Sequence, residues 1–408
     1  MKHFPTILVF WVSFVVTAMT SCDYDETIEN TQVTIELSEP LSGVKVEILN
    51  SLGQTFNVVT NSDGCAQTTL APGIYTISAS STSDDGYVRT AVNGLKSDIV
   101  VSGTATTIYL QVVTSTIQLN NPILIKELYV GGCQKDDGSG HFANDKCIIL
   151  YNNSSQPASL DNVAFGIIEP YNAEASLHTF LSDGVLAYEN EDWVPAINGI
   201  WYFQQGHYIE PYSELVVNVY GCIDNTLTYS QSINYADPDY FTMYDVEATS
   251  ADGGKYNNTN YYPSPSEVIP TSHYLKAVKY GQANAWPISM FSPALILFRS
   301  DNISPKQFGE NPDNIIYPAE KEGNLVYACL KVPRSWIIDA VEVYNGEKLS
   351  TSKKRLTPDL DSGYVPMTSK QSHAVVRRIE SYKDGHPIYQ DTNNSSNDFY
   401  EADHCSLK

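Results

Sequence analysis

Positive charge is scarce in this chain. Lys and Arg together number 24 against 47 Asp and Glu, which gives a formal net charge of -23. A surface this acidic repels phosphate backbones and anionic lipid headgroups, so we expect no nucleic-acid partner. Hydrophobic residues make up 42% of the chain and charged residues only 17%. The 408 residues therefore predict two or three globular domains rather than a disordered chain.

Long apolar runs are absent after the first twenty residues, so the sequence predicts no transmembrane helix. At the start, Lys2 precedes an apolar run over residues 4–16, and Met19-Thr20-Ser21-Cys22 follows. This order predicts a secretory signal peptide over residues 1–21. The Thr-Ser-Cys ending resembles a bacterial lipobox, which implies that the Cys22 thiol is lipidated and that Cys22 becomes the first mature residue.

A polar, acidic stretch follows directly, and it predicts a tether over residues 22–30. Acidic residues just after the lipidated Cys resemble the surface-export signal of Bacteroidetes lipoproteins. This resemblance implies a protein that is lipid-anchored in the outer membrane and displayed at the cell surface. The periplasmic face of that membrane is the alternative.

Local catalytic motifs are also missing. The sequence contains no G-x-S-x-G, H-E-x-x-H, P-loop or G-x-G-x-x-G pattern. No histidine after the signal peptide lies within five positions of another. We therefore expect no cofactor and favour a protein without enzymatic activity, although a hydrolase whose carboxylates meet only in space stays open.

One loop has oxygen donors of the kind that bind calcium. Asp136 and Asp137 precede a Gly-Ser-Gly turn, and Asp145 follows. The spaced D-x-D-x-D-G pattern and the late bidentate Glu of calcium loops are missing. We therefore favour a solvated turn here over a metal site.

Cysteines are few, and six remain after Cys22. They are Cys65, Cys133, Cys147, Cys222, Cys329 and Cys405. An even number in an oxidising compartment permits up to three disulfides. Cys133 and Cys147 are the candidate pair, because a bridge between them would close the base of a polar, Gly-bearing loop. The alternative is that all six stay reduced as small buried hydrophobic residues.

The first domain is predicted over residues 31–116. Apolar and polar residues alternate over residues 33–38 and 44–48, as in strands with one buried face. Asn61-Ser62-Asp63-Gly64 and Pro72-Gly73 supply turns between them. The order of a Val-rich strand, this Asp-Gly turn and Pro-Gly-Ile-Tyr resembles the prealbumin-like, carboxypeptidase-regulatory β-sandwich domain. The resemblance implies a spacer or accessory domain without catalysis.

The rest, residues 117–408, is also β-rich, with dense Pro, Gly, Asn and Ser. Its strand ending in Tyr151-Asn152-Asn153-Ser154, the segment around Pro211 and the closing run D-T-N-N-S-S-N-D-F at 391–399 resemble the immunoglobulin-like lamin-tail domain. Together they resemble a Bacteroidetes lipoprotein family built on a lamin-tail-related domain of unknown function. This implies an all-β fold with an insertion at about 220–330, and the family resemblance gives no information about activity.

Aromatic side chains are the remaining functional indication. The candidate binding residues are Trp193, Trp201, Tyr256, Tyr261 and Tyr262. Exposed, they would contact sugars or a protein partner; buried, they would belong to the core of a β domain.

We expect a non-catalytic binding or accessory module that works with an outer-membrane transporter or assembly. The first alternative is a glycan-binding lipoprotein that uses the aromatic-rich insertion. The second is the hydrolase with carboxylates assembled in space. The expected partners are thus an outer-membrane protein or a glycan.

Overall fold

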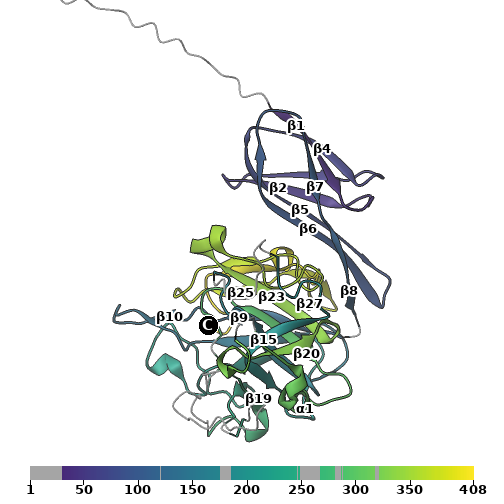
Figure 1. Cartoon of the computed structure of the whole chain (residues 1–408). Coiled ribbons are helices and arrows are strands. Elements are labelled where there is room, and N and C mark those ends of the chain that lie inside the picture. Colours follow the sequence, from purple (N-terminus) through teal and green to yellow (C-terminus); the bar gives the residue numbers. More distant parts are fainter. Residues whose placement is uncertain are drawn as a thin grey trace, which may run out of the picture.

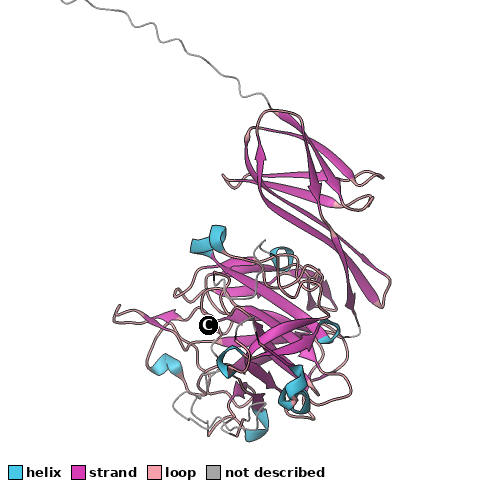
Figure 2. Cartoon of the chain, viewed as in Figure 1, coloured by secondary structure: helices cyan, strands magenta, loops and turns pink. Residues whose placement is uncertain are grey.

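The structure is a computed structural model that describes residues 30–408 except 120, 175–184, 246, 249–266, 281–285, 287 and 318–320. It is built almost wholly from strands with a few short helices, which confirms the all-β prediction (Figure 2). Figure 1 shows two bodies, a small N-terminal one and a larger one that holds the rest of the chain. Among the described residues, no helix is long and apolar enough to cross a membrane.

The N-terminal domain is a sandwich of two sheets. The first has the order β4 (Cys65–Leu70), β1 (Thr31–Leu37), β7 (Thr106–Leu110). The second has the order β3 (Thr55–Val59), β2 (Lys45–Asn50), β5 (Gly73–Asp84), β6 (Val88–Val101), β8 (Val113–Gln118). Inward residues such as Val33, Val46 and Ile77 form one core between the sheets. The alternating pattern in the sequence therefore corresponds to strands with one buried and one open face.

The larger domain is organised around one sheet of fourteen strands, which follows β8 after a short connection. Its order is β24 (Val365–Met367), β23 (Ile337–Asn345), β20 (Ala294–Arg299), β14 (Val163–Ile168), β15 (Trp193–Tyr202), β19 (Tyr274–Val278), β18 (Phe241–Met243), β17 (Glu214–Asn218), β12 (Cys147–Asn152), β9 (Ile123–Tyr129), β25 (Ala374–Arg377), β28 (Phe399–Ala402). β22 (Cys329–Pro333) also pairs with β15, and β21 (Ile315–Ile316) pairs with β22.

Short elements complete this domain. The two-stranded pairs are β10 (Cys133–Gln134) with β11 (His141–Phe142), β13 (Ala158–Ser159) with β16 (Tyr208–Ile209), and β26 (Ile379–Lys383) with β27 (His386–Tyr389). The α-helices among the described residues are α1 (Pro305–Glu310) and α2 (Ser395–Asp398). The 3-10 turns are η1 (Asn225–Leu227), η3 (Thr271–His273), η4 (Pro312–Asn314), η5 (Leu325–Tyr327), η6 (Arg334–Trp336) and η7 (Gly346–Thr351).

The central strands of the large sheet are buried on both faces. Every residue of β9, β12 and β14 is buried. Two large apolar clusters, one containing Phe165 and the other Phe298, take residues from many of the same strands. Strands covered on both sides read as continuous apolar runs instead of alternating ones.

The segment that the sequence sets apart as an insertion contributes to this sheet. β18, β19 and β20 lie within 220–330, and β20 pairs with β14 on one side and β23 on the other. Strands from early, middle and late parts of the chain thus share one core, and this part of the insertion is integral to the domain.

Candidate functional site

The two domains meet where β6 of the sandwich touches the polar run at 391–399. The Arg89 guanidinium donates to the Asp391 carbonyl (3.1 Å) and to the Glu380 carboxylate (3.1 Å). Asn93 donates to the Thr392 carbonyl (2.8 Å) and accepts from the Asn394 amide (3.0 Å). Because Asn93 is only 1% exposed, these contacts form a closed seam and not a passing surface touch.

The run at 391–399 is held rigid by its own hydrogen bonds. Asn394 caps α2 by accepting from the Ser396 amide (3.0 Å). The Asp398 carboxylate accepts from the Thr392 amide (2.9 Å) and hydroxyl (2.8 Å). Burial raises the pKa of Asp398 to about 7. The run that resembles a fold signature in the sequence is therefore also the docking point for the N-terminal domain.

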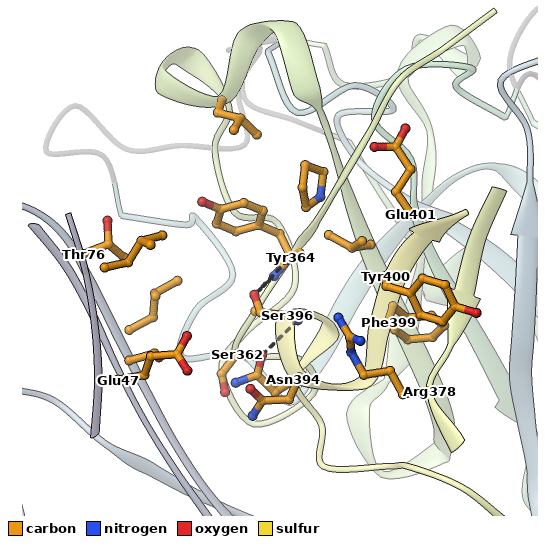
Figure 3. Close-up of a pocket in the computed structure, with 18 residues that line it drawn as sticks. Glu47, Thr76, Ser362, Tyr364, Arg378, Asn394, Ser396, Phe399, Tyr400 and Glu401 are labelled. Carbon is orange, nitrogen blue, oxygen red and sulfur yellow. Dashed lines mark hydrogen bonds between the residues drawn. The ribbon is translucent and has the colours of Figure 1, made fainter. Parts of the chain in front are cut away.

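A cleft opens beside this seam, and it is the candidate functional site. One chamber of about 410 Å³ lies between the two domains (Figure 3). A second chamber of about 500 Å³ shares part of its lining, namely Thr76, Leu95, Leu349, Ser362 and Tyr364. The two chambers therefore form one elongated cleft.

The N-terminal wall of the cleft is the outward face of the five-stranded sheet. Glu47 and Leu49 on β2 and Thr76 and Ser78 on β5 line it. Their neighbours in sequence point into the sandwich core, so strand alternation alone directs these side chains outward. Figure 3 shows Glu47 and Thr76 on these strands, across the cleft from Tyr364.

The opposite wall comes from the larger domain. The Tyr364 ring stacks on Tyr344 with centroids 4.0 Å apart and planes 10° apart. The Ser396 hydroxyl donates to the Tyr364 carbonyl (2.8 Å) and accepts from its amide (3.0 Å). Next to Tyr364, a β-carbon on Gly363 would lie 2.0 Å from the Asn394 side-chain oxygen. Only glycine allows this close approach, which joins the cleft wall to α2.

Tyr400 and Arg378 lie further along the same wall. The Arg378 guanidinium lies 5.2 Å from the centre of the Tyr400 ring. Tyr400, Leu49 and Leu349 are each 40–41% exposed, so the cleft offers apolar surface to an incoming molecule. Rings, a guanidinium, hydroxyls and amides together are groups suited to binding.

Glu401, an acidic residue that lines this wall, already has hydrogen-bond partners. His373 Nδ1 lies 2.6 Å from a Glu401 oxygen, and the Thr368 amide donates to the same oxygen. Burial raises the pKa of Glu401, but these hydrogen bonds outweigh it and hold that pKa below its usual value. A carboxylate held in this way is stabilised as an anion.

The aromatic residues predicted from sequence lie elsewhere. Trp201 is 1% exposed within the core, with Lys279 Nζ 5.7 Å from its ring centre, so it offers no contact surface. It is buried because β15 runs through the middle of the large sheet. Trp193 is half-buried and packs near Tyr188, with ring centroids 6.2 Å apart. Cys22, Tyr256, Tyr261 and Tyr262 lie outside the described residues.

The three acids considered for calcium are separated by their partners. Asp145 is fully buried and accepts from the hydroxyls of Tyr129 (2.5 Å) and Ser232 (2.7 Å). Asp136 accepts from Ser230, and Asp137 from the Ser139 amide. Within the described part of the chain, no three His, Cys, Asp or Glu residues are arranged to hold a metal ion. Asp136 and Asp137 are exposed on the loop between β10 and β11.

The six cysteines among the described residues are free thiols in the structure, and the bridge between Cys133 and Cys147 is not formed. Both of these thiols are buried. Cys147 Sγ instead lies 3.9 Å from Cys405 Sγ. The short polar loop between Cys133 and Cys147 favours a bridge between these two residues in the sequence. The fold instead brings Cys405 of the C-terminal tail to Cys147.

Sequence reasoning missed the cleft residues Tyr364, Arg378, Ser396 and Tyr400. Its one usable signal was the run at 391–399, which contains Ser396 and was interpreted as structural. The other residues carry no motif, because the cleft exists only where two domains meet.

Comparison with known proteins shows a similarity over part of the chain. No curated protein matches the chain. A family model described as "Protein of unknown function (DUF4876)" matches residues 210–406, a range that holds the C-terminal wall of the cleft. The crystal structure of a DUF4876 family protein from Bacteroides thetaiotaomicron VPI-5482 is similar with a TM-score of 0.55 and 19% identity, over 90% of this chain and 94% of the other. The chain is thus similar to a family of unknown function over residues 210–406, and it shares a fold with a member of that family along most of its length.

Proposed function

We propose that this protein is a non-catalytic binding module, attached to the outer membrane through lipidated Cys22, whose partner occupies the cleft between the two domains. The favoured partner is an outer-membrane protein, either a transporter or an assembly component. The observation that carries the proposal is the elongated cleft, with its exposed apolar side chains and its Arg–Tyr pair.

The composition of the cleft supports a protein partner. Tyr and Arg are enriched where proteins bind each other, and they contribute a large share of the binding energy. Tyr400 and Arg378 lie together on one wall, and the exposed side chains of Leu49 and Leu349 supply apolar area nearby. The docked seam at Asn93 fixes the two walls relative to each other, which reduces the ordering cost of binding.

The hydrolase alternative receives less support from the cleft. Retaining and inverting glycosidases need two carboxyl groups about 5 to 9 Å apart on either side of a substrate. The Glu401 carboxylate is engaged by His373 and Thr368, and this arrangement favours a structural anion over an acid that donates a proton.

Affinity purification of the lipidated full chain from gently solubilised outer membranes tests the proposal. We expect a stoichiometric membrane protein with the natural chain and its loss in Arg378→Glu and Tyr400→Ser. Tyr109→Ser is the matched control, because Tyr109 is 65% exposed on β7 and does not line the cleft. Recovery of the chain alone would overturn the protein-partner proposal, and unchanged recovery with both cleft variants would overturn the cleft as its site.

Glycan binding is the second candidate. The location that the sequence predicts for it, at Tyr256, Tyr261 and Tyr262, lies outside the described residues. The cleft offers an alternative location, because the exposed Tyr400 ring lies beside the Arg378 guanidinium, whose N–H groups can donate to sugar hydroxyls. A glycan array with the natural chain, Tyr400→Ser and Tyr256→Ser tests it. Binding that is lost only in Tyr400→Ser supports the cleft as the glycan site. Binding that is lost only in Tyr256→Ser supports the insertion.

The proposed location at the outer membrane rests on the signal peptide, the lipobox and the acidic tether. Metabolic labelling with a radioactive fatty acid checks the anchor, and we expect Cys22→Ser to abolish it. Protease treatment of intact cells distinguishes surface display, in which the chain is cleaved, from the periplasmic face, in which it is protected.

A further inference from the structure

The C-terminal tail brings two buried thiols together. Cys147 begins β12, in the middle of the large sheet, and Cys405 follows the last strand, β28. Their sulfur atoms lie 3.9 Å apart, and the two residues are 0% and 2% exposed. Tyr129, Ile149 and Tyr235 belong to the same apolar cluster as these cysteines. The contact is therefore part of a packed interior and not a chance approach at the surface.

Polar contacts of the residues that follow Cys405 hold the tail in this position without help from sulfur. The Ser406 amide donates to the Glu127 carboxylate (2.9 Å). Lys408 Nζ donates to the backbone carbonyl (2.9 Å) and the side-chain oxygen (2.7 Å) of Gln231. The tail thus places Cys405 against Cys147 by its own hydrogen bonds.

We propose that Cys147 and Cys405 form a disulfide that fastens the C-terminal tail to the centre of the large sheet. A disulfide needs sulfur atoms about 2.05 Å apart, so each sulfur has to move by about 1 Å.

Cys133 is the competing thiol, and its surroundings keep it out of the bond. It lies against the buried carboxylate of Asp145, which also accepts from Tyr129 and Ser232. Burial and this carboxylate raise the pKa of Cys133 to about 12. Asp145, Tyr129 and Ser232 do not belong to the tail, so Cys133 is held as a hydrogen-bond donor before the tail docks as well as after it. A thiol held in this way is a poor nucleophile in disulfide exchange, whereas Cys405 is accessible before docking.

The order of events follows from the same chemistry. In the docked tail, the hydrogen bond with Cys147 and burial raise the pKa of Cys405 well above its usual value. Exchange therefore takes place while the tail is still undocked and the thiolate is accessible. The Cys405 thiolate attacks a disulfide oxidant RSSR, forms a mixed disulfide and releases RS⁻. The Cys147 thiolate then attacks the Cys405 sulfur and releases the second RS⁻. Two electrons pass to the oxidant, and the two protons lost by the cysteines yield two RSH.

The disulfide would close a covalent loop between two positions 258 residues apart. A loop of this length strongly restricts the unfolded chain in the loop-entropy model, and we expect the oxidised protein to melt about 8 °C above the reduced one. The segment after β28 would then be protected from fraying.

Peptide mapping of the full chain tests the pairing independently of where the protein resides. The purified chain is refolded in a buffer of oxidised and reduced glutathione, alkylated with iodoacetamide and digested without reduction. We expect one cross-linked peptide that joins Cys147 to Cys405 and an alkylated Cys133. Alkylation of both Cys147 and Cys405, or a peptide that joins Cys133 to Cys147, would overturn the proposal.

Melting temperatures with and without a reducing agent supply the second measurement. The natural chain and Cys133→Ser should both lose about 8 °C on reduction, whereas Cys405→Ser should show no such loss. If Cys133→Ser also loses its sensitivity to reduction, the bond involves Cys133 and the assignment is wrong. The natural chain alone remains informative if a variant fails to fold, because its cross-linked peptide is read directly.

Discussion

The two domains of this protein bury their residues in different ways. In the sandwich, strands alternate between one apolar core and an outward polar face. In the larger domain, the central strands are buried on both sides. Among the described residues, every buried charged side chain lies in the larger domain, whereas the sandwich buries only neutral polar groups such as Asn93.

This contrast determines where each domain is sensitive to a change of charge. A sheet with one open face can place its polar residues in water. A sheet covered on both faces can accommodate a charge only when that charge is paired. Arg377 and Asp339 illustrate this, because the guanidinium donates to both carboxylate oxygens at 2.6 and 2.5 Å inside the larger domain. We therefore expect single charge changes to act strongly there and weakly in the sandwich.

The largest expected effect comes from Arg377→Met. The substitution leaves the Asp339 carboxylate buried without its cation, and removes the donor to the Ile125 carbonyl (2.7 Å). We expect a loss of about 3–5 kcal/mol in the free energy of unfolding, measured by urea denaturation. Arg378→Met is the matched control, because Arg378 is adjacent to Arg377 in the sequence but is exposed. This substitution should change the free energy of unfolding by less than about 0.5 kcal/mol. Equal effects at the two positions would contradict the comparison.

Glu169 should make the stability of the larger domain depend on pH. Burial raises its pKa from an ordinary 4.5 to about 7, against a smaller opposing effect of Arg355. Because the folded form holds its proton more tightly, this contribution is complete below about pH 4.5 and is lost as the pH rises to about 7. We expect a loss of roughly 3 kcal/mol across that window from this residue.

Unfolding curves at several pH values check this expectation. Glu169→Gln should remove the decline between pH 4.5 and 7, whereas Glu39→Gln, at an exposed position of the sandwich, should leave it intact. A decline that is unchanged in Glu169→Gln would assign the pH dependence to other groups.

A smaller effect is expected at the seam, where the two kinds of packing meet. Asn93→Ala removes the donor to the Thr392 carbonyl and the acceptor for Asn394. The groups left behind are buried, so we expect a cost of about 1–2 kcal/mol and a sandwich that melts separately from the larger domain. Calorimetry reports both quantities. Asn57→Ala, at an exposed position on β3, should keep the transitions as they are in the natural chain.

The smallest effect is expected at the surface of the sandwich. Lys45 Nζ lies 3.6 Å from the Glu47 carboxylate, and both side chains are about half exposed. Lys45→Ala should change the unfolding free energy by less than about 0.5 kcal/mol. The contrasting variant is Lys354→Ala, because Lys354 Nζ lies 2.7 Å from the buried Glu342 carboxylate. If Lys45→Ala lowers the free energy of unfolding as much as Lys354→Ala does in denaturation experiments, burial does not explain why the two domains differ in their sensitivity to charge changes.

Much of the sandwich was predictable from local pattern. Alternation over residues 33–38 and 44–48 corresponds to β1 and β2, and Pro72-Gly73 precedes or opens β5 as expected. In the larger domain, the apolar runs at 123–130 and 147–150 correspond to β9 and β12. The same runs did not reveal which strands would be neighbours, and so they did not reveal that Trp201 would be buried in the middle of a sheet.

Local sequence patterns specify the all-β class, the strands of the sandwich and the turns between them, because side-chain alternation and turn chemistry are properties of a few adjacent residues. The cleft, the seam and the neighbour of Cys147 arise only from contacts between distant segments. Asn93 meets Asn394 across 301 residues, and Cys147 meets Cys405 across 258. Contacts this distant depend on how sheets stack and pair, and no local pattern in a single chain records that outcome.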